Sequence, residues 1–170
     1  MIRLNLSSLA HARVGRQHWV DLDIDSVHVG DTELRDLRGN LEFTRIAEGI
    51  LVLGELDAEA KTECTRCLTP FFQPIKIELE DTIGLPGASL TPERPVRVHE
   101  DGWTDLTPLI REYVWLGLPP KPICSSTCQG LCPECGGNRN LGECICENVA
   151  SIDPRWEALR QLVDKPGGTQ

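Results

Sequence analysis

Long hydrophobic runs are missing from this 170-residue chain. No apolar stretch approaches the roughly 20 residues that a transmembrane helix needs, and one of the longest, residues 50–53, is only core-sized. Residues 1–6 alternate between apolar and polar and lack the continuous apolar region of a secretory signal. We therefore expect a cytoplasmic protein that makes no contact with a membrane and resides in a reducing compartment.

Sequence signatures of catalysis are also missing. The chain has no Gly-x-Ser-x-Gly, no glycine-rich phosphate-binding loop and no His-Glu-x-x-His. Its four histidines show no metal-ligand spacing and have no cysteine nearby; they are His11, His18, His28 and His99. We therefore expect a protein that is not an enzyme and has no small-molecule substrate.

Basic residues are scarce, since 17 Lys and Arg stand against 26 Asp and Glu and leave a net charge of −9. This balance disfavours non-specific binding of nucleic acid by the whole surface. The charges are uneven: residues 1–20 hold Arg3, Arg13 and Arg16 and no acid, whereas residues 21–33 hold five acids and no base. The basic start predicts either a solvated terminal segment or an electropositive arm for an anionic partner.

Alternation of apolar and polar residues predicts strands in the first half, at 34–44, 49–61 and 71–83. Residues 45–49 suit a turn, and residues 64–67 lie where the next hairpin must reverse. Because short connections favour antiparallel neighbours, we expect a meander-like sheet. Proline and glycine are frequent over residues 84–102, which predicts a loop with a short strand at 96–98.

Apolar residues at helical spacing predict a helix over 104–117, which Thr104 or Asp105 caps and whose first turn holds Pro108. Asp153–Pro154 predicts the start of a C-terminal helix. The expected fold class is α+β: an antiparallel β-sheet body with one packed helix, a cysteine-rich zinc-knuckle segment and a C-terminal helix. The corresponding ranges are 1–120, 121–150 and 151–170.

Eight cysteines stand in four close pairs: Cys64 and Cys67, Cys124 and Cys128, Cys132 and Cys135, Cys144 and Cys146. Residues 124–146 hold few aliphatic side chains, so burial alone cannot hold this segment together. In a reducing compartment, paired cysteines indicate metal binding rather than disulfides. Zinc takes four thiolates in a tetrahedron, and a tight turn that carries two cysteines supplies half of it. We expect two structural zinc ions.

The knuckle sequence Cys132-Pro133-Glu134-Cys135-Gly136 indicates which pairs share an ion. Its second cysteine is followed nine residues later by Cys144, a separation long enough for the chain to bring residues 144 and 146 back to the same ion. Residues 64, 67, 124 and 128 then form the other site. A [4Fe–4S] cluster, a thioredoxin-like redox pair at 64/67 and disulfides are the alternatives.

The chain resembles the YceD family of large-subunit ribosomal RNA accumulation proteins over about residues 34–163. The resemblance rests on Cys64-Thr65-Arg66-Cys67-Leu68, on the stretches 118–124 and 128–138, on Cys144-Ile145-Cys146 and on Asp153-Pro154-Arg155. Arg139 stands where the family pattern tends to have leucine, and it adds a positive charge beside the metal site.

The resemblance implies a cytoplasmic or organellar protein in ribosome biogenesis, needed for normal levels of large-subunit rRNA. The implied partner is that rRNA or its precursor. The acidic balance of the chain suggests the alternative, a zinc-stabilised adaptor that binds a basic ribosomal or other protein without direct RNA contact. As candidate contacts we take the arginines of the basic start and those beside the zinc turns: Arg3, Arg13, Arg16, Arg66 and Arg139. An exposed arginine or a local salt bridge is the alternative for each.

Overall fold

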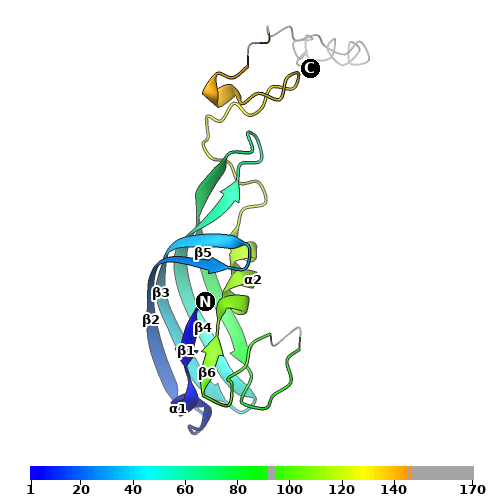
Figure 1. Cartoon of the computed structure of the whole chain (residues 1–170). Helices are drawn as coiled ribbons and strands as arrows, with labels where there is room; N and C mark the ends of the chain where they lie inside the picture. Colours follow the sequence, from blue (N-terminus) through cyan, green and yellow to red (C-terminus); the bar gives the residue numbers. More distant parts are fainter. Residues whose placement is uncertain (92–94, 145, 147–170) are drawn as a thin grey trace, which may run out of the picture.

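Four long antiparallel strands form the body of the molecule. A computed structural model describes residues 1–91, 95–144 and 146 of the chain. The strands follow one another as a meander, each paired with its neighbour in sequence, and the sheet is strongly curved (Figure 1). They are β2 (Gln17–Val29), β3 (Thr32–Ile46), β4 (Gly49–Glu63) and β5 (Pro70–Ile83).

The three predicted strands are confirmed as β3, β4 and β5, each a little longer than expected. Their alternation places one set of side chains on the inner face of the sheet, where Phe43, Leu56 and Ile77 are fully buried. The turn expected over residues 45–49 is tighter, because Ile46 pairs directly with Gly49. The hydrophobic pattern therefore predicts both the sheet and its order.

Strand β2 was not predicted. The sequence had indicated an acidic stretch there, but Asp21, Asp23 and Asp25 alternate with apolar residues. Leu22 is buried, and its neighbours on the same face, Val20 and Ile24, are half-buried against the core. The period-2 signal was present in the sequence but is masked by the run of acids.

The N-terminal segment packs onto the body, so the expectation of a solvated terminal segment is wrong, whereas a role of its arginines toward an anionic partner stays a prediction. Strand β1 (Arg3–Asn5) pairs with β6 (Trp103–Asp105), and the one-turn helix α1 (Ser7–Ala10) follows. Ile2, Leu6 and Leu9 are buried in the main core. The segment is held because its apolar residues pack against the inner face of the sheet, a contact that its local basic charge does not reveal.

Helix α2 (Thr107–Gly117) lies on the inner side of the sheet and packs against β5 (Figure 1). It begins three residues later than expected because Trp103–Asp105 forms β6 instead. The Asp105 carboxylate still accepts a hydrogen bond from the Thr107 N–H at 2.9 Å, which satisfies one free donor of the helix start. At the edge of β5, the Tyr113 hydroxyl donates to the Glu80 carbonyl at 2.6 Å.

The remaining expectations have mixed outcomes. Residues 84–91 and 95–102 form loops as predicted, but residues 96–98 contribute a single bridge from Arg97 to Gly84 rather than a strand. A 3-10 turn, η1 (Arg139–Leu141), lies in the cysteine-rich segment. The predicted C-terminal helix lies outside the described residues. Among the described residues, no helix is long and apolar enough to span a membrane.

The β4–β5 hairpin extends beyond the rest of the sheet and carries the cysteine-rich region at its end. The last residue pairs of this hairpin, from Lys61–Phe72 to Glu63–Pro70, have no partner on β3, whose pairing with β4 stops at Leu34–Ala60. The hairpin end therefore rises as a narrow two-stranded neck above the body (Figure 1).

We predict that Gly39→Ala lowers the free energy of unfolding by about 3 kcal/mol. Gly39 has φ 150°, and a Cβ there would overlap the carbonyl oxygen of Glu55 on β4, so strain and overpacking add. Gly87→Ala is the matched control, because Gly87 also has positive φ (80°) but a Cβ there meets no atom within 4 Å. It should cost only about 1–2 kcal/mol. Urea denaturation measures both, and equal losses would contradict the predicted overlap.

Candidate metal centres

The first cysteine cluster joins the tip of the β4–β5 hairpin to the segment that follows α2. Cys64 and Cys67 occupy the hairpin tip, and Cys124 and Cys128 approach from the later segment. The four sulfurs lie within 4.8 Å of one another. Cys64, Cys67 and Cys128 are buried and Cys124 is exposed. The tip of the hairpin is thus fastened to a segment 57 residues further along the chain.

The sulfur spacings in this cluster fit one tetrahedral ion. The Sγ atoms of Cys64 and Cys128 are 3.8 Å apart, and those of Cys67 and Cys124 are 3.6 Å apart. Zinc–sulfur bonds of about 2.3 Å imply an edge of about 3.8 Å between thiolates on the same ion. All eight cysteines are free, so disulfides are not formed. Thiolates on the corners of a [4Fe–4S] cube bind different irons and are held further apart.

The hairpin tip forms a knuckle, a tight turn that carries two cysteines of the first cluster. The Cys64 carbonyl accepts from the Leu68 N–H at 2.9 Å, and the Cys64 N–H donates to the Thr69 carbonyl at 3.0 Å. This tight turn directs the Arg66 N–H to the Cys64 sulfur at 3.4 Å. Backbone donors of this kind stabilise a thiolate and orient it toward a metal.

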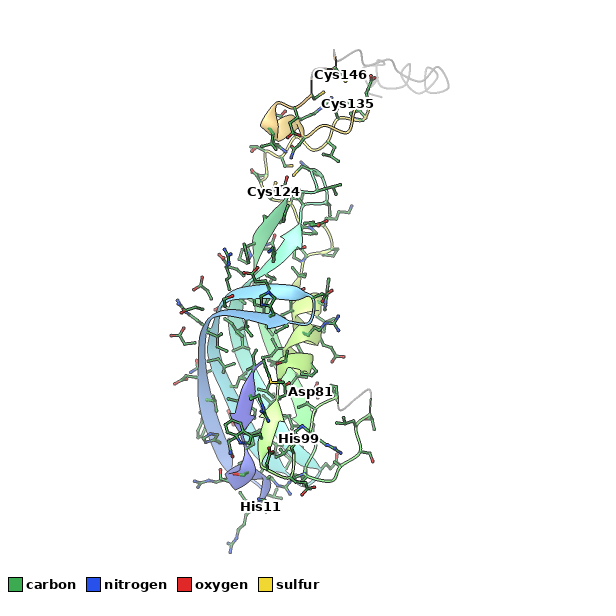
Figure 2. The ribbon with its side chains drawn as sticks, in the orientation of Figure 1. His11, Asp81, His99, Cys124, Cys135 and Cys146 are labelled. Atoms are coloured by element: carbon green, nitrogen blue, oxygen red, sulfur yellow. The ribbon has the colours of Figure 1, made fainter. Side chains whose placement is uncertain are left out.

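The second cluster, Cys132, Cys135, Cys144 and Cys146, repeats the same turn. Here the Cys132 carbonyl accepts from the Gly136 N–H at 2.9 Å, and the Cys132 N–H donates to the Gly137 carbonyl at 2.9 Å. Its four sulfurs also lie within 4.8 Å of one another. Figure 2 shows the second cluster beyond the first, at the far end of the cysteine-rich region. Both clusters group the cysteines as the sequence predicts.

The two knuckles differ at the residue with positive φ. This residue is Gly136 in the second knuckle (φ 71°) and Leu68 in the first (φ 58°). A left-handed conformation costs a residue with a Cβ roughly 1–2 kcal/mol, and glycine avoids that cost. Leu68 is also 58% exposed, so burial does not offset the strain. The hydrogen bonds of the knuckle and the sulfur cluster hold Leu68 in this conformation.

The first cysteine of each knuckle is poised as a thiolate. The Cys124 N–H makes the largest contribution to lowering the pKa of Cys64 to about 6, against the effect of burial. In the second knuckle the Cys135 and Glu134 N–H groups lower the pKa of Cys132 to about 6. The hydrogen bond with Cys135 raises the pKa of Cys146 to about 12, because neighbouring sulfurs share protons there. Four adjacent thiols reach full ionisation only with a cation among them.

Hydrogen bonds from asparagine side chains connect the second cluster to the first. The Asn138 amide donates to the Thr69 hydroxyl at 3.1 Å, and the Asn140 amide donates to the Cys128 sulfur at 3.5 Å. The Leu131 N–H also donates to the Arg66 carbonyl at 3.0 Å. The sequence alone did not predict a role for Asn138 or Asn140. The polar run Asn138-Arg139-Asn140 beside a knuckle was the available signal.

The candidate arginines do not gather on one surface. The Arg66 guanidinium donates to the Cys128 carbonyl at 3.2 Å, and half-buried Arg139 lines a shallow hollow beside Cys144 and Cys146. Arg3 lies over the ring of Trp103, 5.6 Å from its centroid.

Arg13 and Arg16 are exposed between α1 and β2. That end of the sheet is separated from the hairpin tip by the length of β4, roughly 45 Å. The N-terminal arginines and the knuckle arginines therefore cannot act as one continuous patch.

Several known proteins are similar to this chain. Uncharacterized proteins of Mycobacterium tuberculosis (strain ATCC 25618 / H37Rv) and Mycobacterium bovis are each 30% identical over 180 residues, which covers 93% of this chain and 82% of theirs. The protein named large ribosomal RNA subunit accumulation protein YCED homolog 1, chloroplastic, of Arabidopsis thaliana is 33% identical over 66 residues, covering 37% of this chain and 21% of its own. No solved structure matches.

A family model completes the comparison. The model described as large ribosomal RNA subunit accumulation protein YceD matches residues 52–163. The match spans most of the β4–β5 hairpin, all of α2 and all eight cysteines of both clusters. With its two four-cysteine clusters at the end of a β-sheet body, the chain belongs to the YceD family.

Proposed function

We propose that this chain is a non-enzymatic, zinc-stabilised factor that supports the accumulation of large-subunit rRNA in the cytoplasm. Family membership supports the link to rRNA. The observation that carries the rest is the pair of four-cysteine clusters, with four sulfurs within 4.8 Å in each. A zinc ion with four thiolates has no open position for water or substrate, so such a site stabilises structure and does not catalyse.

The zinc ions would serve to present a rigid recognition surface. Each knuckle fixes a turn with exposed side chains, among them Leu68 and Glu134, on a segment with little core of its own. A turn held by metal loses little conformational entropy when it binds a partner. Structural zinc contributes on the order of 10–16 kcal/mol of apparent binding free energy, which far exceeds what so few aliphatic residues supply.

A direct contact with rRNA would use the basic residues near the knuckles. Arg66 and Arg139 lie beside the sulfur clusters, and Lys121 precedes the first cysteine of the later segment. Arg66 is an exposed residue, although one of its guanidinium nitrogens donates to the Cys128 carbonyl. These cations are few, so contact here would involve a small number of phosphates.

A second candidate is capture of a basic ribosomal protein, and the outer face of the sheet favours it. The face turned away from α2 carries an excess of acids over bases: Asp21, Asp23, Glu42, Glu55, Asp57, Glu78 and Glu80 against Arg35, Arg38, Lys61 and Lys76. Each loaded four-thiolate site adds −2, so two zinc ions take the net charge from −9 to about −13. A negatively charged surface attracts basic proteins and repels the phosphates of RNA.

Metal analysis should find two zinc ions per chain. Cys132→Ser with Cys135→Ser should leave one ion and the body intact, because the first cluster does not depend on the second for its ligands. Cys64→Ser with Cys67→Ser should remove the first ion. It should also weaken zinc binding at the second site, whose segment is hydrogen-bonded to Arg66 and Thr69. Zinc content by mass spectrometry and far-UV circular dichroism measure both effects.

One result would contradict the zinc assignment, and another would contradict the dependence of the second cluster on the first. A brown protein that contains iron would indicate that the cysteines bind an iron–sulfur cluster instead of zinc. Equal loss of both ions from either double variant would contradict the mounting of the second cluster on the first. Ser125→Ala with Ser126→Ala is the matched control, since it alters two exposed residues between Cys124 and Cys128 that are not ligands.

Salt dependence separates the two candidate functions. Direct rRNA contact predicts that log K falls with log salt concentration, with a slope of about −0.7 to −0.9 for each phosphate contacted. Arg66→Gln should then reduce the slope by about one contact, whereas Arg13→Gln, at the far end of the sheet, should not. Fluorescence anisotropy with large-subunit rRNA fragments measures this. Absent RNA binding together with tight capture of a basic ribosomal protein would favour the second candidate.

A further inference from the structure

The free edge of strand β2 is open along most of its length. The sheet order is β2-β3-β4-β5, so β2 has a partner on one side only, and Figure 1 shows it as the outer margin of the sheet. In the part of the chain that the structure describes, no backbone hydrogen bond reaches this edge from another segment. By contrast, α2 covers part of the opposite edge, where Tyr113 bonds to the backbone of Glu80. An edge strand with unpaired N–H and C=O groups is a template for one more strand.

The register identifies which residues face the open edge. The Arg45 N–H donates to the Arg16 carbonyl at 2.8 Å, just before Gln17 pairs with Thr44. In an antiparallel ladder every second residue makes such bonds and the residues between point the other way. The N–H and C=O groups of Trp19, Asp21 and Asp23 therefore point to the open edge.

The side chains along this edge form two distinct rows. Trp19, Asp21 and Asp23 lie on the outer face and are exposed, with Trp19 at 59% and the Asp23 side chain at 75%. Val20 and Ile24 lie on the inner face and are only half-buried at the margin of the core. An added strand would place one row of its side chains beside the acids and the other beside these aliphatic residues.

We propose that the Trp19–Asp23 edge of β2 binds an extended basic segment of a partner protein as a fifth, antiparallel strand. The segment would alternate Lys or Arg with aliphatic residues. Its basic residues would face Asp21 and Asp23, with one stacked on Trp19, and its aliphatic residues would cover Val20 and Ile24.

Charge selects this occupant over a second copy of the chain. Two β2 edges would bring like-charged aspartates together, which is unfavourable. The base nearest to the aspartates is Arg38, which bonds to Asp23 at 2.9 Å and lies on β3 rather than on the edge. Asp25 has a 96% exposed side chain and continues the acidic row. The edge therefore disfavours pairing with the β2 edge of a second copy and favours pairing with a basic strand.

The first experiment titrates a capped peptide of alternating lysine and valine, seven residues long, into the full-length, zinc-loaded, ¹⁵N-labelled chain. The amides of Trp19, Asp21 and Asp23 should show the largest chemical-shift changes and slower exchange with solvent. The same peptide N-methylated at two lysines, whose N–H groups would face β2, should bind more than tenfold more weakly. N-methylation at two valines, whose N–H groups would face away, should leave affinity within about twofold.

The second experiment tests charge at the edge. Asp21→Asn and Asp23→Asn should each weaken the unmodified peptide about threefold, which is the effect of losing one cross-strand ion pair. Glu78→Gln with Glu80→Gln is the matched control, because it removes two charges from the outer face of β5 at the opposite side of the sheet. It should change affinity less than twofold.

Three results would overturn the proposal. They are no binding of the alternating peptide, equal binding of the two N-methylated forms, and an equal loss in the β5 control. The last two would mean general attraction to an acidic surface, and the first would mean that the aspartates serve only to protect the edge from aggregation. Failure of rRNA or zinc binding would not affect the outcome, since the edge belongs to the body of the sheet.

Discussion

The cysteine-rich region depends on one contact, the convergence of four sulfurs at the tip of the β4–β5 hairpin. Cys64 and Cys67 come from the sheet, and Cys124 and Cys128 come from a segment that has left α2. Few apolar side chains cross this junction: Phe71 and Ile123 pack against the buried cysteines. Burial of two partly exposed residues is too small to order the segment, so a metal ion held by the four thiolates would supply most of the free energy there.

The second cluster inherits its position from the first. Asn140 donates to the sulfur of Cys128, and Asn138 donates to Thr69, so the polar side chains of one knuckle complete the surroundings of the other. Gly130 eases this approach, since it has φ 74° and a Cβ there would make a tight contact of 3.1 Å with the Arg66 carbonyl oxygen. The hydrophobic core of the sheet therefore supports the first cysteine cluster, and the first cluster in turn supports the second.

Electrostatics divides the molecule in a way that bears on its partners. The arginines that suggest RNA are dispersed between the two ends, and those near the clusters lie beside cysteines whose thiolates would add negative charge once a metal is bound. The acids, in contrast, are concentrated on one face because β2, β3, β4 and β5 all turn their polar rows outward. A protein of this design suits a basic partner at the sheet, and a contact with rRNA would be confined to the region of the knuckles.

The sequence by itself determined strands β3, β4 and β5, the helix and the grouping of the cysteines, because these rest on periodicity and on ligand spacing along the chain. Only the tertiary structure decided the rest. The basic N-terminal segment became part of the core because Ile2, Leu6 and Leu9 found the inner face of the sheet. The acidic stretch became an edge strand because β3 offered it a partner. The asparagine links between the clusters join residues up to 69 positions apart, a contact that no local pattern encodes.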